Sequence, residues 1–260
     1  MSLSLSRREV LAMMGATGTL TAFAATDART GFKTIGVLGG IGPQATMDFE
    51  ARMHGAAQRL VPQRANNGYP PMVVYYHRHP PILVNEDLSP RFPIRPDPRL
   101  LAAAARLGSW ADFLVITSNG PHLIQDQIEE AASCPVLSMI DVTLDEVRRR
   151  GWRKVGVLGL GDPIVYTARL GQLNAGSETI TGDLRRRLDA EIMKVMEGHD
   201  DASSTAVARE AIDVLRARRV DGIILGCTEI PLLVRGDAAA ADLVDPVQLL
   251  AEAAVRCAIA

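Results

Sequence analysis

The segment IGVLG at residues 35–39 decides the expected fold, because it recurs as VGVLG at residues 155–159. Both runs are short and apolar, as are the buried strands of parallel sheets. A proline follows each run at the same offset, Pro43 in the first copy and Pro163 in the second. The chain is therefore expected to contain two copies of one strand–turn plan.

A second repeated pair extends the comparison. DFLVITSN at residues 112–119 matches DGIILGCT at residues 221–228, and the two pairs occur in the same order in each copy. General similarity among βα units is the alternative explanation. Short apolar runs alternate with longer amphipathic segments throughout, which predicts an α/β fold with parallel sheets. The expected strands are 34–38, 72–76, 113–117, 136–140, 155–158 and 222–225. The expected helices are 44–59, 98–107, 123–132, 143–150, 184–197, 203–218 and 246–259.

These elements predict two pseudo-symmetric parallel-sheet α/β domains with the active site in the cleft between them. The first is expected to comprise residues 33–141 plus 241–260, and the second residues 142–240. Ligands of open parallel sheets bind beyond the carboxyl ends of the strands. Ser118 and Cys227 each come directly after such an end. If the halves face each other, these two side chains approach one small molecule from opposite sides.

The N-terminal residues 1–28 are expected to be a twin-arginine-type signal peptide. Arg7-Arg8 precedes a weakly apolar stretch without charge, and Ala22-Phe23-Ala24 offers the small residues of a cleavage site. A membrane anchor is the alternative, but the stretch is short of the ~20 strongly apolar residues of a span. We therefore expect a periplasmic mature protein, free of the membrane after signal cleavage.

Composition excludes several other classes of protein. The 260 residues carry 28 Lys and Arg against 30 Asp and Glu, a formal net charge of -2, so no nucleic-acid partner is expected. The three cysteines and five histidines have no metal-site spacing, and no metal is expected. Cys134 and Cys257 are interpreted as packing residues.

The turn Gly40-Ile41-Gly42 also fits part of a dinucleotide-binding pattern. Such a site needs an acidic residue at the end of the next strand, where this chain has His77. A nucleotide cofactor is therefore not expected.

Three motifs together indicate a family. GGIGPQAT at residues 39–46, SNGPH at 118–122 and LGCTEIPLL at 225–233 resemble the aspartate/glutamate racemase superfamily, and within it the aspartate racemase branch. The resemblance runs from about Lys33 to the C-terminus. It implies two α/β domains, no cofactor, a small amino-acid substrate, a possible homodimer, and two opposed cysteines that exchange a proton with the substrate's α-carbon.

This chain departs from that pattern at Ser118, where the family usually has its first cysteine. A thiol can be converted to a thiolate at a helix N-terminus, whereas a serine hydroxyl needs a neighbouring base. The resemblance thus implies that Cys227 is the main acid/base and Ser118 a weaker opposed partner.

The remaining site residues lie in the same motifs, except Arg78, which follows the strand expected at 72–76. Asn119, Gly120, Thr228 and the turn Gly40, Ile41 and Gly42 are expected to hold substrate carboxylates. Glu229 is expected to cap its helix and to tune Cys227. His122 is either a proton relay or a structural histidine, and Arg78 is either a carboxylate clamp or a solvated loop residue.

The expected function is a cofactor-independent racemase or epimerase acting at the α-carbon of an acidic amino acid such as aspartate or glutamate. Two alternatives stay open. One is a decarboxylase or isomerase of a small dicarboxylate that needs a single thiol. The other is a catalytically silent periplasmic binding protein.

Overall fold

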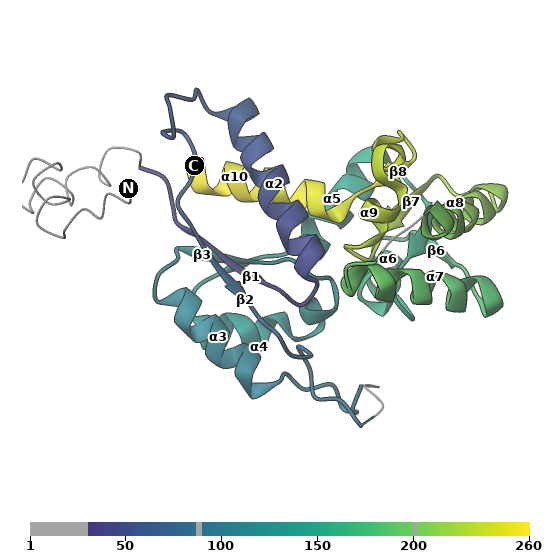
Figure 1. Ribbon diagram of the computed structural model, residues 1–260. Helices are drawn as coiled ribbons and strands as arrows, with labels where there is room; N and C mark the ends of the chain where they lie inside the picture. The colour runs from purple at the N-terminus through teal and green to yellow at the C-terminus, as the bar shows by residue number, and fades with distance from the viewer. Residues whose placement is uncertain (1–30, 87–89, 200–201) are drawn as a thin grey trace, which may run out of the picture.

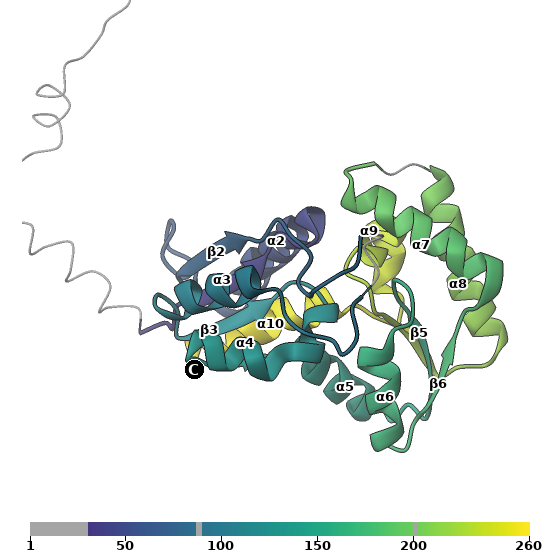
Figure 2. The ribbon, with the colours of Figure 1, turned by 90° about the horizontal axis from the view of Figure 1, so that it is seen from below.

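The computed structural model describes residues 31–86, 90–199 and 202–260. The expected signal peptide, residues 1–28, lies outside these ranges. The described chain forms two lobes, each built on a four-stranded parallel sheet with helices on both faces (Figures 1 and 2). Within the described ranges, no helix has the length and apolar character needed to cross a bilayer. The expected fold class, two similar parallel-sheet α/β units, is confirmed.

The first sheet has the strand order β2-β1-β3-β4. Its strands are β1 (Ile35–Gly39), β2 (Met72–Tyr76), β3 (Phe113–Ile116) and β4 (Val136–Leu137). The helical elements that accompany them are α2 (Pro43–Leu60), α3 (Pro98–Gly108), the 3-10 helix η2 (Gly120–Ile124), α4 (Gln125–Ala132) and α5 (Met139–Arg150).

The second sheet has the equivalent order, β6-β5-β7-β8. Its strands are β5 (Lys154–Leu158), β6 (Gly176–Thr179), β7 (Gly222–Leu225) and β8 (Leu243–Val244). The helical elements that accompany them are α6 (Ile164–Gln172), α7 (Gly182–Met196), α8 (Ala202–Ala217), α9 (Ile230–Val234), the 3-10 helix η3 (Arg235–Ala239) and α10 (Pro246–Ile259).

The internal repeat of the sequence is preserved in the register of the strands. In the first sheet Ile35 pairs with Phe113, and at the corresponding place in the second sheet Val155 pairs with Gly222. An aspartate at the equivalent position of each half anchors the central pair of strands. Asp112 Oδ2 accepts a 2.6 Å hydrogen bond from the backbone N–H of Thr34, and Asp221 Oδ2 accepts one of 2.8 Å from that of Lys154. The two halves therefore share strand order, register and an aspartate that fixes the start of the first strand.

Each half supplies a helix to the other. Helix α5 follows β4 of the first sheet, yet Ile140, Leu144 and Val147 pack in a core with β5, α6 and β7 of the second. Helix α10 follows β8 of the second sheet, yet its buried face packs with β1, α2 and β3 of the first. In Figure 1, α10 crosses from the second lobe to lie beside α2, an extensive contact. This exchange holds the two lobes together.

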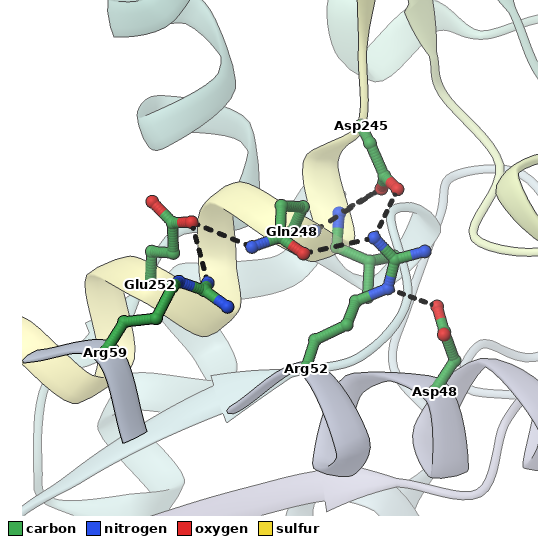
Figure 3. Close-up of polar contacts among 7 residues, drawn as sticks. Asp48, Arg52, Arg59, Asp245, Gln248 and Glu252 are labelled. Carbon is green, nitrogen blue, oxygen red and sulfur yellow. Dashed lines mark hydrogen bonds and ion pairs between the residues drawn. The ribbon is translucent and has the colours of Figure 1, made fainter. Parts of the chain in front are cut away.

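A polar network fixes the beginning of α10 against α2 (Figure 3). Asp245 caps α10, because its Oδ1 accepts hydrogen bonds from the backbone N–H groups of Val247 and Gln248 at 2.9 and 3.3 Å. Its Oδ2 pairs with Arg52 Nη1 at 2.7 Å, and Arg52 Nε also donates to Asp48 at 2.6 Å. The Asp245 side chain is only 8% exposed, so Arg52 compensates a carboxylate largely removed from water.

Several element bounds differ from those expected. The run expected as a strand over 136–140 ends at Leu137, because Ser138 caps α5 by accepting a hydrogen bond from the Asp141 N–H. The region expected as a helix from 123 begins as η2 at Gly120. Strands β6 and β8 and helices α6 and α9 were not expected. The expected domain boundary at 141 falls inside α5, and the one at 241 precedes β8, which pairs with β7 of the second sheet.

Candidate active site

A cavity of about 590 Å³ lies between the two halves, at the carboxyl ends of their strands. Its walls are formed by the segments that follow β1, β2 and β3 in the first half and β5 and β7 in the second. The lining residues are Gly40–Pro43, His77–Ile82, Val84, Pro90, Ser118–Pro121, Leu123, Gly159, Leu160, Asp162–Val165, Met196 and Gly226–Glu229. This is the edge at which parallel sheets bind ligands.

Ser118 and Cys227 both line this cavity, one from each half. Ser118 follows β3 and Cys227 follows β7, and β3 and β7 occupy equivalent places in the two sheets. Both side chains are half-buried. Within the described part of the chain, the Ser118 side chain has no hydrogen-bonding partner, so no neighbouring base is placed to take its proton. A ligand in the cavity therefore meets a hydroxyl from one half and a thiol from the other.

The Cys227 thiol is paired with a buried carboxylate. Its Sγ donates a hydrogen bond to Glu229 Oε2 at 3.0 Å, and the Thr228 hydroxyl donates to the same oxygen at 3.0 Å. Burial raises the pKa of the Cys227 thiol well above its ordinary value, and the negative charge of Glu229 raises it further. Burial also raises the pKa of Glu229, whose side chain is 2% exposed.

These contacts correct two expectations. Glu229 occupies the N-cap position of α9, but its side chain makes no capping hydrogen bond. A helix terminus was expected to favour the thiolate of Cys227, whereas the thiol is the stable form. The physical reason is that α9 has only five residues, while Glu229 places an acceptor and a negative charge beside the sulfur.

The first glycine turn makes room for this carboxylate. A Cβ atom on Gly42 would lie 2.1 Å from Glu229 Oε1, so any other residue at this position would displace the Glu229 carboxylate. Gly40 has a positive φ of 78°, and a Cβ there would collide with the backbone of Tyr76 and His77. Thr46 fixes the turn, because its Oγ1 accepts a 2.8 Å hydrogen bond from the Gly40 N–H.

Asn119 is held by a tyrosine from the other half. The Tyr166 hydroxyl donates to Asn119 Oδ1 at 2.6 Å, and the Tyr166 side chain is fully buried. Burial raises the pKa of Tyr166, so the phenol stays protonated and remains a donor. Among the described residues, Asn119 Nδ2 has no partner. The bond to Tyr166 therefore orients a free amide N–H₂ in a residue that lines the cavity.

His77, at the end of β2, is a second buried polar residue of the lining. It is 2% exposed, and no described residue partners its Nε2. Burial lowers the pKa of His77, which outweighs a hydrogen bond with the backbone of Pro80. The neutral ring therefore has one buried, unpartnered nitrogen, in a residue that lines the cavity.

Arg78 and His122 differ in their relation to the cavity. Arg78 lines it, is exposed, and stacks over the Tyr76 ring with its guanidinium carbon 4.8 Å from the ring centre. His122 does not line it. His122 Nδ1 lies 2.8 Å from Gln125 Oε1, and burial lowers the pKa of His122 to about 4. The structure thus does not bring His122 into the cavity with Ser118.

The other expected site residues, Gly40, Ile41, Gly42, Gly120 and Thr228, all line the cavity. Sequence reasoning missed His77 and Tyr166 as parts of the site. The repeat offset of 120 residues could have found Tyr166, since it occupies the position that Thr46 has in the first copy. Across the described ranges, no three or more His, Cys, Asp or Glu side chains form a group that could hold a metal ion.

Comparison with known proteins identifies the family. The model of the family described as Asp/Glu/hydantoin racemase matches residues 38–254, most of the chain. The chain belongs to the Asp/Glu/hydantoin racemase family. The family resemblance seen in the sequence motifs is thereby confirmed.

Individual members of the Asp/Glu/hydantoin racemase family are distant in sequence but similar in fold. A broad-specificity amino-acid racemase of Bacillus subtilis, RacX, is 22% identical over 87% of this chain and 98% of its own length. The structure of Picrophilus torridus aspartate racemase matches with a TM-score of 0.67 at 22% identity, over 87% of this chain and 94% of that one. An aspartate racemase homologue from Pyrococcus horikoshii matches with a TM-score of 0.65 at 21% identity, over 87% of this chain and 99% of that one.

Proposed function

We propose that this protein is a pyridoxal-phosphate-independent racemase or epimerase that acts at the α-carbon of an amino acid. Family membership supports the reaction class. The observation that carries the proposal is that Ser118 and Cys227, from equivalent strand ends of the two halves, line one cavity. The acidic substrates aspartate and glutamate, suggested by the family resemblance, are the reference substrates for this reaction.

Cys227 and Glu229 act in this mechanism as a pair that shares one proton and one negative charge. In the resting pair the proton is on sulfur and the charge on the carboxylate. Transfer of the thiol proton to Glu229 leaves a thiolate, which can then remove the α-proton of a bound substrate. Because the pair carries the same total charge before and after the transfer, no new charge is buried in making the base.

The electron pair left at the α-carbon is delocalised into the substrate carboxylate, which therefore gains negative charge. Asn119 Nδ2 is a preoriented donor for that carboxylate, and donors already in place stabilise such charge strongly. Neutral His77 has an unpartnered nitrogen that suits the substrate's ammonium group. Ser118 donates a proton to the opposite face of the carbon, which inverts it. The resulting serine alkoxide takes a proton from water, and the Cys227–Glu229 pair, which has gained the α-proton, releases one proton to water, so no net proton is consumed.

Proton exchange in heavy water tests this proposal. Incubation with D- and L-amino acids should give deuterium at the α-carbon together with inversion, measured by proton NMR and chiral chromatography. The variant Cys227→Ala should lose exchange, and Ser118→Cys should increase the ratio of inversion to exchange. Exchange that persists in Cys227→Ala would remove the thiol from the mechanism.

A second candidate reaction is protonation by a single thiol after decarboxylation or isomerisation of a small dicarboxylate. The lack of a hydrogen-bonding partner for Ser118 within the described residues favours it, since a serine without a base is a weak acid/base. Exchange without inversion, or turnover of a dicarboxylate, would identify this one-sided chemistry. Binding of an amino acid or dicarboxylate with neither exchange nor turnover would identify a binding protein.

We also propose export of this protein to the periplasm, supported by the arginine pair Arg7-Arg8 and the uncharged stretch that follows it. Replacement of both arginines by lysine should retain the protein in the cytoplasm, as measured by cell fractionation. Equal periplasmic amounts of both forms would contradict this proposal.

A further inference from the structure

Large apolar side chains that face solvent gather at the cavity. Among the described residues, seven large hydrophobic side chains are exposed, and three of them, Leu123, Leu160 and Ile164, line the cavity. Their exposed fractions are 45%, 43% and 44%. Leu123 belongs to η2 of the first half and Ile164 to α6 of the second, and these two elements contact each other. We call these three residues the apolar wall.

The charges around the cavity do not suit a second substrate carboxylate. Arg78 is the one lysine or arginine in the lining, and its guanidinium is already stacked on Tyr76. Asp162 and Glu229, by contrast, bring two carboxyl groups to the same lining. The Arg185 guanidinium lies 3.7 Å from the Asp162 carboxylate, and the Asp162 side chain is 67% exposed. A dicarboxylic amino acid would place one carboxylate near these groups or against the apolar wall, and desolvating it there without a partner is unfavourable.

We propose that the cavity selects an α-amino acid with a bulky apolar side chain over an acidic one, and that the apolar wall contacts that side chain. This inference rests on the proposed function and departs from the acidic substrate suggested by the family resemblance. Exposed apolar side chains grouped in a concave site mark the binding of an apolar group, whose transfer from water is favourable. Polar recognition is then confined to the amino and carboxylate groups, which Asn119 and His77 can contact.

Leucine and aspartate form a matched pair for the test, because their side chains branch at the same carbon and differ in carrying methyl groups or carboxylate oxygens. Binding of both enantiomers of each to the full chain is measured by isothermal titration calorimetry. Exchange of the α-proton is measured separately in heavy water. We expect leucine to bind at least tenfold more tightly than aspartate and to exchange with at least tenfold higher kcat/KM.

The two readouts separate failure of this inference from failure of the proposed function. Tighter binding of leucine with no exchange of either amino acid would refute the proposed function and leave the side-chain preference standing. Exchange of aspartate with equal or higher kcat/KM would support the proposed function and overturn the preference. Binding of neither amino acid would also overturn it.

A charge introduced into the apolar wall provides a second measurement. Leu160→Lys should lower the ratio of leucine to aspartate affinity at least tenfold, since it replaces apolar surface by a cation. The control is Met193→Lys on α7, where the side chain is 40% exposed and outside the lining. That control should keep the ratio of the unmodified protein. An unchanged ratio in Leu160→Lys would contradict the assignment of the wall.

Discussion

The Tyr166 hydroxyl donates a 2.6 Å hydrogen bond to Oδ1 of Asn119, across the boundary between the two halves. Tyr166 lies on α6 of the second half, whereas Asn119 follows β3 of the first. The bond leaves Nδ2, which is buried, as the amide atom without a partner among the described residues. A residue that does not itself line the cavity thus fixes the orientation of the Asn119 amide.

Replacing Tyr166 by phenylalanine tests this role. We expect Tyr166→Phe to lower kcat/KM for α-proton exchange by about tenfold, the equivalent of about 1.4 kcal/mol, because the Asn119 amide loses its orientation. The free energy of unfolding should fall by about 1 kcal/mol, as one buried hydrogen bond is lost. The control is Tyr69→Phe, which removes a tyrosine hydroxyl outside the cavity that accepts a hydrogen bond from Gln58. Unaltered exchange in Tyr166→Phe would limit the tyrosine to a packing role.

The thiol–carboxylate pair predicts a shift in the titration of Cys227. The charge and hydrogen bond of Glu229 raise the pKa of the thiol, so Glu229→Gln should lower that pKa. The thiolate absorbance, followed against pH in a Cys134→Ser, Cys257→Ser background, should therefore appear at lower pH in the variant. Exchange at neutral pH should nevertheless fall, since the acceptor for the thiol proton is gone. A thiolate midpoint equal to or above that of the parent would disprove the pairing.

The close approach of Gly42 to Glu229 predicts an unusual sensitivity at this glycine. Gly42→Ala places a methyl group 2.1 Å from Glu229 Oε1, so the carboxylate must leave the position in which its Oε2 accepts the hydrogen bond of Cys227. We expect exchange to fall by roughly two orders of magnitude, about 2.7 kcal/mol. Gly171→Ala on α6 is the matched control, because its Cβ would meet nothing within 4 Å. Full exchange activity in Gly42→Ala would show that the position of Glu229 is unimportant.

Two histidines, each with a buried Nε2 atom, provide another matched comparison. Among the described residues, neither His77 nor His122 has a partner for Nε2, but only His77 lines the cavity. His77→Phe is expected to raise KM for the amino acid about tenfold, by loss of one hydrogen bond worth about 1.4 kcal/mol. His122→Phe should leave KM unchanged. The opposite ranking in steady-state kinetics would favour His122 as the ligand contact.

The network at the start of α10 predicts a pH-dependent loss of stability. Arg52→Met leaves the buried Asp245 carboxylate without its counter-ion, and we expect a loss of about 2 kcal/mol at neutral pH. Burial raises the pKa of Asp245, and removal of Arg52 raises it further. The unfolded state titrates in the same way in both proteins, so the loss relative to the parent develops as pH rises from the folded-state pKa of the parent to the higher folded-state pKa of the variant. It disappears below both.

Urea unfolding at acid and neutral pH measures this effect. Arg59→Met is the control, because Arg59 joins the same two helices through Glu252 at 3.2 Å but is 58% exposed (Figure 3). Exposed pairs contribute little, so its loss should stay below about 1 kcal/mol. Equal losses in the two variants, or a loss in Arg52→Met that is independent of pH, would contradict the account of Asp245.

The sequence predicts those parts of the molecule whose residues carry a local pattern. The apolar runs of β1, β3, β5 and β7 are predictable because central parallel strands are buried on both faces. Strand β6 reads GSET and lies at an edge of its sheet, so no apolar pattern marks it. Helix α9 has five residues, too few for a helical period.

In the site, motif position predicts which residues reach the cavity but not how each side chain is paired. Ser118 and Cys227 follow from the rule that ligands bind at strand ends. The raised pKa of Cys227 depends on where Glu229 points, and the exclusion of His122 depends on the path of η2. Both are consequences of tertiary packing, which no pattern along the chain records.

The exchange of α5 and α10 has a consequence for any attempt to divide the molecule. A cut between α5 and β5 gives an N-terminal fragment with two defects. Its sheet is no longer covered by α10, and its last helix, α5, has lost the second sheet on which it packs. The other fragment has the converse defect. Neither piece is a self-sufficient folding unit, whereas the two produced together contain every surface needed to reassemble.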